Sequence, residues 1–108
     1  MKTLKLYLDF LAGPVWKRYF NEEKGCGVTG IDVVDNDAKL WELNQMVQDM
    51  YTSCYQFDVG DQPFIFTTEG LDKKAMMDAM QRVKDRLAEI NDGSFVIEDY
   101  ATAEIMSL

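Results

Sequence analysis

Apolar side chains recur every three or four residues along two long segments of the chain. In the first segment, which ends near Tyr55, they fall at Leu40, Leu43, Val47, Met50, Tyr51 and Cys54. In the second, over residues 71–90, they fall at Leu71, Ala75, Met76, Ala79, Met80, Val83, Leu87 and Ile90. This spacing places each set on one side of an α-helix. The pattern therefore predicts two helices, each with one apolar face that must be covered.

A period of two, which is typical of a strand with one buried face, marks the start of the chain. Leu4, Leu6 and Leu8 alternate with polar or aromatic residues, so we predict a strand over residues 3–10. Further β-favouring runs predict strands over residues 15–20, 28–34, 64–68 and 95–100, with residues 101–108 as a continuation or a tail. Between them, residues 21–27 are expected to form a hairpin loop and residues 58–63 a turn-rich connection.

The predicted order of elements is β-β-β-α-β-α-β. It favours an α+β fold in which a mostly antiparallel sheet of four to five strands carries two helices packed on one face. The length of 108 residues predicts one domain over residues 1–108. The helix stripes predict that Leu43, Val47, Met80, Val83 and Leu87 are core residues. The first helix follows the strand over 28–34 directly, with Asp35 or Asn36 as its N-cap.

The net charge of the chain limits the classes of molecule that it is expected to bind. The chain has 11 lysines and arginines against 19 aspartates and glutamates, a net charge of −8. Such a surface repels nucleic acid and anionic lipid, and it attracts a basic protein. No apolar run approaches the roughly 20 residues that span a bilayer. Because charges at Lys5 and Asp9 interrupt the region where a signal peptide is apolar, we expect a cytoplasmic protein.

The absence of histidine removes the side chain best suited to proton transfer near neutral pH. We therefore expect no enzymatic activity and no cofactor. Asp32, Asp35 and Asp37 could hold Mg²⁺ through hard oxygen ligands, but the spacing does not fit an EF-hand, because Lys39 stands at the fifth position counted from Asp35. Helix capping by one acid, with two solvated acids beside it, explains the same residues. A divalent-metal enzyme that uses these carboxylates stays open as an alternative.

A glycine-rich stretch around Cys26 spells a dinucleotide-binding pattern, Gly25-x-Gly27-x-x-Gly30. It precedes a predicted strand instead of joining a strand to a helix, so no helix N-terminus would meet the phosphates. Cys26 has only Lys24 nearby to activate its thiol, which favours an inert loop cysteine. Cys54 lies on the helix stripe, and a framework disulfide between the two is not favoured.

Trp41 lies at the margin of the first helical stripe, next to a corner rich in acids. A half-exposed aromatic ringed by carboxylates is typical of a protein–protein anchor, although packing at the edge of the core is the other interpretation of a large aromatic. We predict a partner-binding surface that consists of Asp32, Asp35, Asp37, Trp41 and Glu42.

Four stretches of the chain carry a resemblance to a known class of proteins: Leu6-Tyr7-Leu8-Asp9, Gly13-Pro14-Val15-Trp16, Gly30-Ile31-Asp32 with Asp37 and Leu40, and Asn91-Asp92-Gly93-Ser94-Phe95-Val96-Ile97-Glu98-Asp99-Tyr100. With these stretches the chain resembles the immunity proteins of bacterial contact-dependent growth inhibition and polymorphic toxin systems. The resemblance implies a non-catalytic cytoplasmic protein that binds and blocks one toxin domain, often a basic nuclease. It assigns no site residue. The alternative from another class is a homodimeric structural or regulatory module, built through an edge strand or a methionine-lined face.

Overall fold

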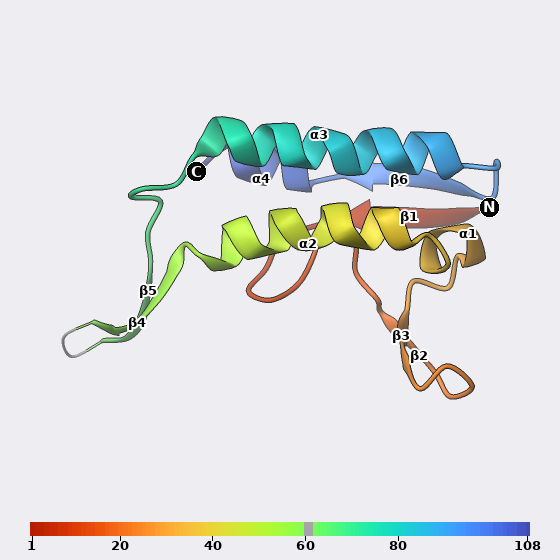
Figure 1. The fold of residues 1–108 in the computed structure, drawn as a ribbon, viewed down its shortest axis with the longest axis horizontal. Helices are drawn as coiled ribbons and strands as arrows, with labels where there is room; N and C mark the ends of the chain where they lie inside the picture. The colour runs from red at the N-terminus through yellow and green to blue at the C-terminus, as the bar shows by residue number, and fades with distance from the viewer. Residues whose placement is uncertain (60–61) are drawn as a thin grey trace.

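Two long helices and a pair of parallel strands form the body of the molecule (Figure 1). The computed structural model describes residues 1–59 and 62–108. Strand β1 (Lys2–Leu6) pairs in parallel with β6 (Phe95–Asp99), with Lys2 opposite Phe95 and Leu6 opposite Asp99. Helix α2 (Ala38–Thr52) packs against α3 (Lys73–Ile90). Two short helices, α1 (Asp32–Asp35) and α4 (Ala101–Met106), complete the body.

The core lies between the β1–β6 pair and the apolar faces of α2 and α3. The alternation of β1 buries Leu4 and Leu6, and β6 adds Phe95. The helices contribute Leu40, Val47, Met76, Ala79, Met80, Val83 and Leu87 to the same cluster. The predicted core positions Val47, Met80, Val83 and Leu87 are thus confirmed as buried, and Leu43 packs half-buried at the edge.

Two antiparallel hairpins project from the same side of the body (Figure 1). The first joins β2 (Tyr19–Asn21) to β3 (Cys26–Val28), with Tyr19 opposite Val28. The second joins β4 (Tyr55–Val59) to β5 (Gln62–Phe66), with Tyr55 opposite Phe66. Each hairpin strand pairs only with its own neighbour among the described residues.

The predicted antiparallel sheet of four to five strands, with both helices on one face, is wrong. The fold is α+β, but its six described strands form three separate pairs, and four helices accompany them. The pair in the body is parallel because the chain returns to β1 through α3. A strand that follows such a crossover runs in the same direction as the first. The strands of the two hairpins do not pair with β1 or β6, so they do not enlarge the sheet of the body.

The strand predicted over residues 28–34 ends at Val28, and its second half is a helix. The carboxylate of Asp35 accepts hydrogen bonds from the backbone N–H groups of Thr29 (2.7 Å) and Gly30 (3.2 Å). Gly30 has φ of +85°, which turns the chain at this point. These contacts close a loop that leads into α1, where Val34 is buried. The β-branched residues thus reach the core from a short helix.

The strand predicted over residues 15–20 is present only at its end, as β2. The side chain of Asn44, which is buried on α2, takes the place of a neighbouring strand at Val15. Its Oδ1 accepts from the N–H of Val15 (2.8 Å), and its Nδ2 donates to the carbonyl of Val15 (3.3 Å). The N–H of Tyr7 donates to the carbonyl of Pro14. The segment is therefore pinned between β1 and α2 without continuing as a strand.

The boundaries of the helices also differ from the predictions. Helix α2 begins after Asp37, not after Asp35 or Asn36, and it ends at Thr52 instead of near Tyr55. Helix α3 begins at Lys73, two residues later than predicted, because the side chain of Asp72 caps it. Residues 101–106 form α4 and do not continue the last strand.

The region around the second hairpin is partly outside the described residues. Strand β4 was not predicted, and β5 begins two residues before the predicted strand over 64–68. The turn-rich connection predicted over 58–63 includes residues 60 and 61, which lie outside the described residues.

Replacing Leu87 with alanine tests the core assignment. Leu87 is 0% exposed, so Leu87→Ala should lower the free energy of unfolding by about 2–5 kcal/mol, through lost transfer energy and a cavity. Urea unfolding followed by circular dichroism measures the change. Leu11→Ala, at a residue that is 62% exposed, is the matched control. Its cost should stay below about 0.5 kcal/mol, and a similar cost for both variants would contradict the assignment.

Candidate functional site

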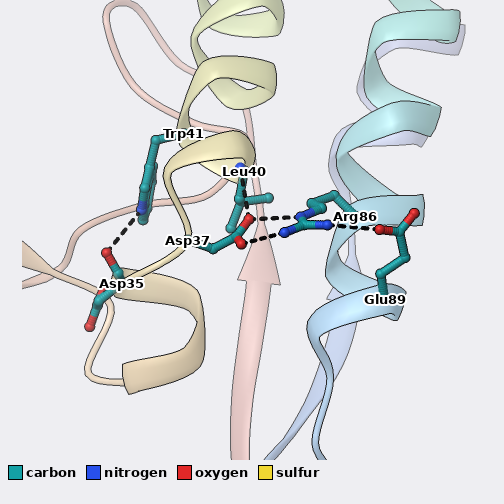
Figure 2. A network of polar contacts seen from close by, with 6 residues as sticks. All are labelled: Asp35, Asp37, Leu40, Trp41, Arg86 and Glu89. Carbon is teal, nitrogen blue, oxygen red and sulfur yellow. Dashed lines mark hydrogen bonds and ion pairs between the residues drawn. The ribbon is translucent and has the colours of Figure 1, made fainter.

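Asp37 joins the start of α2 to α3 (Figure 2). Its carboxylate accepts from the N–H of Leu40 (2.9 Å) and so caps α2. The same carboxylate makes two hydrogen bonds with Arg86 of α3, from Nε (2.8 Å) and from NH2 (2.6 Å). Arg86 also pairs with Glu89 (2.8 Å). This two-pronged geometry is the strongest form of an arginine–carboxylate contact.

The electrostatics of the pair follow from this geometry. The hydrogen bonds from Arg86 hold the pKa of Asp37 below its ordinary value of 3.8, and partial burial opposes them. The hydrogen bond to Asp37 raises the pKa of Arg86, and the one to Glu89 adds to the effect. Both groups are therefore charged at neutral pH, and the negative charge of Asp37 is directed at the guanidinium instead of at solvent.

Trp41 lies on the opposite side of α2 from Arg86, pointing away from α3 (Figure 2). Its indole N–H donates to the backbone carbonyl of Asp35 (3.3 Å). The ammonium of Lys17 lies 4.5 Å from the centre of its ring. These contacts hold a half-buried aromatic in one orientation, so little conformational entropy would be lost if another surface packed against it.

A shallow depression runs along the side of α2 that faces away from α3. It is lined by Ala38, Trp41, Glu42, Gln45, Met46 and Asp49, which we call the α2 outer face. Met46 is 41% exposed, and the side chain of Gln45 donates to Asp49 (2.7 Å). A second depression, lined partly by Trp16 and Lys17, meets the first at Trp41. An exposed methionine and a half-buried tryptophan thus lie beside two acids.

The structure divides the predicted partner-binding set. Trp41 and Glu42 both lie on the α2 outer face. Asp37 faces Arg86, and Asp35 holds the loop before α1 with both carboxylate oxygens. Asp32 is exposed on α1. Only Trp41 and Glu42 are therefore brought together on one surface that a partner could contact.

Met46 and Asp49 also belong to this surface, although the predicted partner-binding set does not include them. The signal was present in the sequence. Positions 38, 42, 45 and 49 follow steps of three and four residues, which defines a second stripe on α2. A stripe that consists of one alanine, one glutamine and two acids does not have the uniform apolar pattern by which a buried face is recognised.

Clusters of possible metal ligands and the two thiols are the remaining groups of chemical interest in the described residues. No group of three or more histidine, cysteine, aspartate or glutamate residues in the described part could hold a metal ion. Cys26 and Cys54 are both free thiols; Cys26 is exposed, and burial raises the pKa of Cys54, which disfavours its reactive thiolate. Across residues 1–59 and 62–108, no helix combines the length and the apolar character needed to cross a membrane.

Comparison with family models found no match, and comparisons with curated proteins and with solved structures found none either. The geometry of the α2 outer face and the distribution of charge are therefore the features that bear on function.

The Asp37–Arg86 pair should make stability depend on pH. Because the pKa of Asp37 is lower in the folded protein, the contribution of the pair is complete above the unfolded value of about 3.9 and is lost as the pH falls through the folded value. Asp37→Asn keeps a capping side chain but loses the charge. It should therefore be less stable than the unmodified protein at pH 7.

Urea unfolding at a series of pH values checks this expectation. The difference between the two proteins should shrink steadily as the pH falls below about 4. Asp32→Asn, at an exposed acid of α1, is the control and should cost little at any pH. A difference for Asp37→Asn that stays constant from pH 7 to pH 2 would show that the ion pair does not contribute through charge.

Proposed function

We propose that this protein is a non-catalytic, cytoplasmic binding protein of the immunity type, which neutralises a basic toxin domain by packing its α2 outer face against it. The observation that carries the proposal is the combination of half-buried Trp41 and exposed Met46 with Glu42 and Asp49 on one helical surface. Apolar and aromatic anchors supply binding energy, and charges around them select the partner.

Charge supports a basic partner. Asp37 is neutralised by Arg86, so the negative potential of the α2 outer face comes from Glu42 and Asp49, with the net charge of −8 behind them. A positively charged domain would be steered toward the molecule as a whole and would then meet carboxylates beside the apolar side chains. The resemblance to toxin-immunity proteins supports the same class of partner.

A homodimeric module is the second candidate, and exposed apolar residues on projecting segments favour it. Phe20 on the β2–β3 hairpin is 71% exposed. Leu11, in the segment between β1 and β2, is 62% exposed. Pairing two copies would cover such side chains. Light scattering at micromolar concentration separates the candidates, because a monomer favours heterologous binding and a dimer favours self-association.

Growth rescue tests the proposed function directly. A toxin domain encoded by the neighbouring gene should arrest growth when it is expressed alone, and co-expression of this protein should restore growth. Trp41→Ala and Met46→Ala should weaken the rescue. Met46→Ala is the cleaner variant, because Met46 is 41% exposed and lies outside the hydrophobic core. If no adjacent domain is toxic, or if toxicity persists with this protein present at equal level, the immunity proposal fails.

Binding kinetics should separate the two kinds of contact. Glu42→Lys with Asp49→Lys should slow association by about tenfold or more at low salt and weaken its salt dependence, because these charges act on encounter. Met46→Ala should instead speed dissociation, since it removes a buried contact. Surface plasmon resonance measures both rates.

The control is Glu69→Lys with Asp78→Lys, which changes the net charge equally at two exposed positions away from the α2 outer face. If it slows association as much as the α2 variants do, net charge alone guides the encounter and the α2 outer face is not the interface.

A further inference from the structure

Strand β1 has an open edge that forms one wall of a groove. Its other edge is occupied by β6, and the bridge between Leu6 and Val15 closes the groove at one end. The opposite wall of the groove is formed by Trp16, Arg18 and Tyr19, together with the turn at Thr29 and Gly30. The groove, about 560 Å³ in volume, therefore lies between the body and the β2–β3 hairpin.

The backbone of β1 presents hydrogen-bonding groups to this groove. The N–H of Lys2 donates to the carbonyl of Ser94, and the carbonyl of Leu6 accepts from the N–H of Tyr100. The backbone N–H and carbonyl groups of the even-numbered residues of β1 therefore point toward β6. The N–H of Tyr7 points the other way, toward Pro14. Because these directions alternate along a strand, both backbone groups of Thr3 and the N–H of Lys5 face the groove, whereas the carbonyl of Lys5 belongs to the antiparallel bridge between Leu6 and Val15. No hydrogen bond joins them to β2 or β3 in the described part of the chain.

The groove is basic, although the protein as a whole is acidic. Lys2, Lys5 and Arg18 line it, and no acidic side chain does. Lys2 donates to the carbonyl of Gly30 across the groove, and Arg18 lies over the rings of Tyr7 and Trp16. None of these three cations forms an ion pair among the described residues. Their positive charge is therefore available to a ligand.

We propose that this groove binds an extended acidic segment of a partner protein, which adds as a strand to the open edge of β1. Thr3 and Lys5 would supply the backbone hydrogen bonds, and Lys5 and Arg18 would select carboxylates. Lysine on an edge strand opposes pairing with apolar or basic strands. An acidic strand would instead be attracted to these lysines, so they would favour acidic segments over other extended segments.

This surface is separate from the α2 outer face, because the two depressions share no lining residue. The inference therefore stands whether or not the protein neutralises a toxin. It also concerns a partner segment of opposite charge to the one proposed for the α2 outer face.

A capped peptide that alternates valine and glutamate tests the proposal with the intact protein. Fluorescence anisotropy should show saturable binding, and amide hydrogen exchange should slow at Thr3 and Lys5. Two further peptides carry N-methyl groups on alternate residues, in one phase or in the other. Strand addition uses only one edge of the peptide, so one phase should abolish binding and the other should retain it. Simple electrostatic adsorption would not distinguish the two phases.

Charge reversals on the protein complete the test. Lys5→Glu with Arg18→Glu should weaken binding by about tenfold or more, or about 1.4 kcal/mol. Lys74→Glu with Arg82→Glu, at exposed positions of α3, matches the change in net charge and should have little effect. The proposal is overturned if the acidic peptide does not saturate, if both N-methylated phases bind equally, or if the two double variants weaken binding alike. Tighter binding of a poly-thymidine oligonucleotide to the same residues would overturn it as well.

Discussion

The ion pair between Asp37 and Arg86 connects the two halves of the helical layer. The two residues are 49 positions apart, and the carboxylate that accepts from the guanidinium also caps α2. One side chain therefore determines both where α2 begins and how its first turn sits against α3. The loop before α1, held by Asp35, follows directly, and Trp41 is anchored to the carbonyl of the same Asp35. The position of the α2 outer face depends on this sequence of contacts.

Local pattern was sufficient to predict the two long helices. A stripe of apolar residues at three- and four-residue steps is a property of a single segment, and burial of Val47, Met80 and Leu87 follows from it. The sheet could not be found in this way. Residues of β1 pair with residues more than 90 positions later in the chain, and the parallel direction depends on the path of α3 between them. No periodicity within either strand carries that information.

Side chains that replace backbone partners account for the other differences. Asn44 occupies both hydrogen-bonding groups of Val15, and Asp35 occupies the N–H groups of Thr29 and Gly30. An aromatic-rich run over residues 15–20 and a β-branched run over residues 30–34 each looked like a strand. An amide or a carboxylate contributed from elsewhere in the chain satisfied the backbone instead. The candidate site was predicted only in part for the same reason. The shared surface of Trp41 and Glu42 follows from the helix alone. The role of Asp37 does not, because it depends on Arg86, which lies far away in the sequence.

The acidic α2 outer face of one copy and the basic groove at β1 of another copy have opposite charges, but their shapes and backbone groups do not match. The acidic α2 outer face belongs to a helix, whose backbone N–H and carbonyl groups are already used within the helix. The open edge of β1 needs an extended strand with free backbone groups, which a helix cannot offer. Coulomb attraction between copies would thus bring together two surfaces that cannot form the required hydrogen bonds. The two proposals therefore call for partners other than a second copy: a basic surface at α2 and an acidic strand at β1.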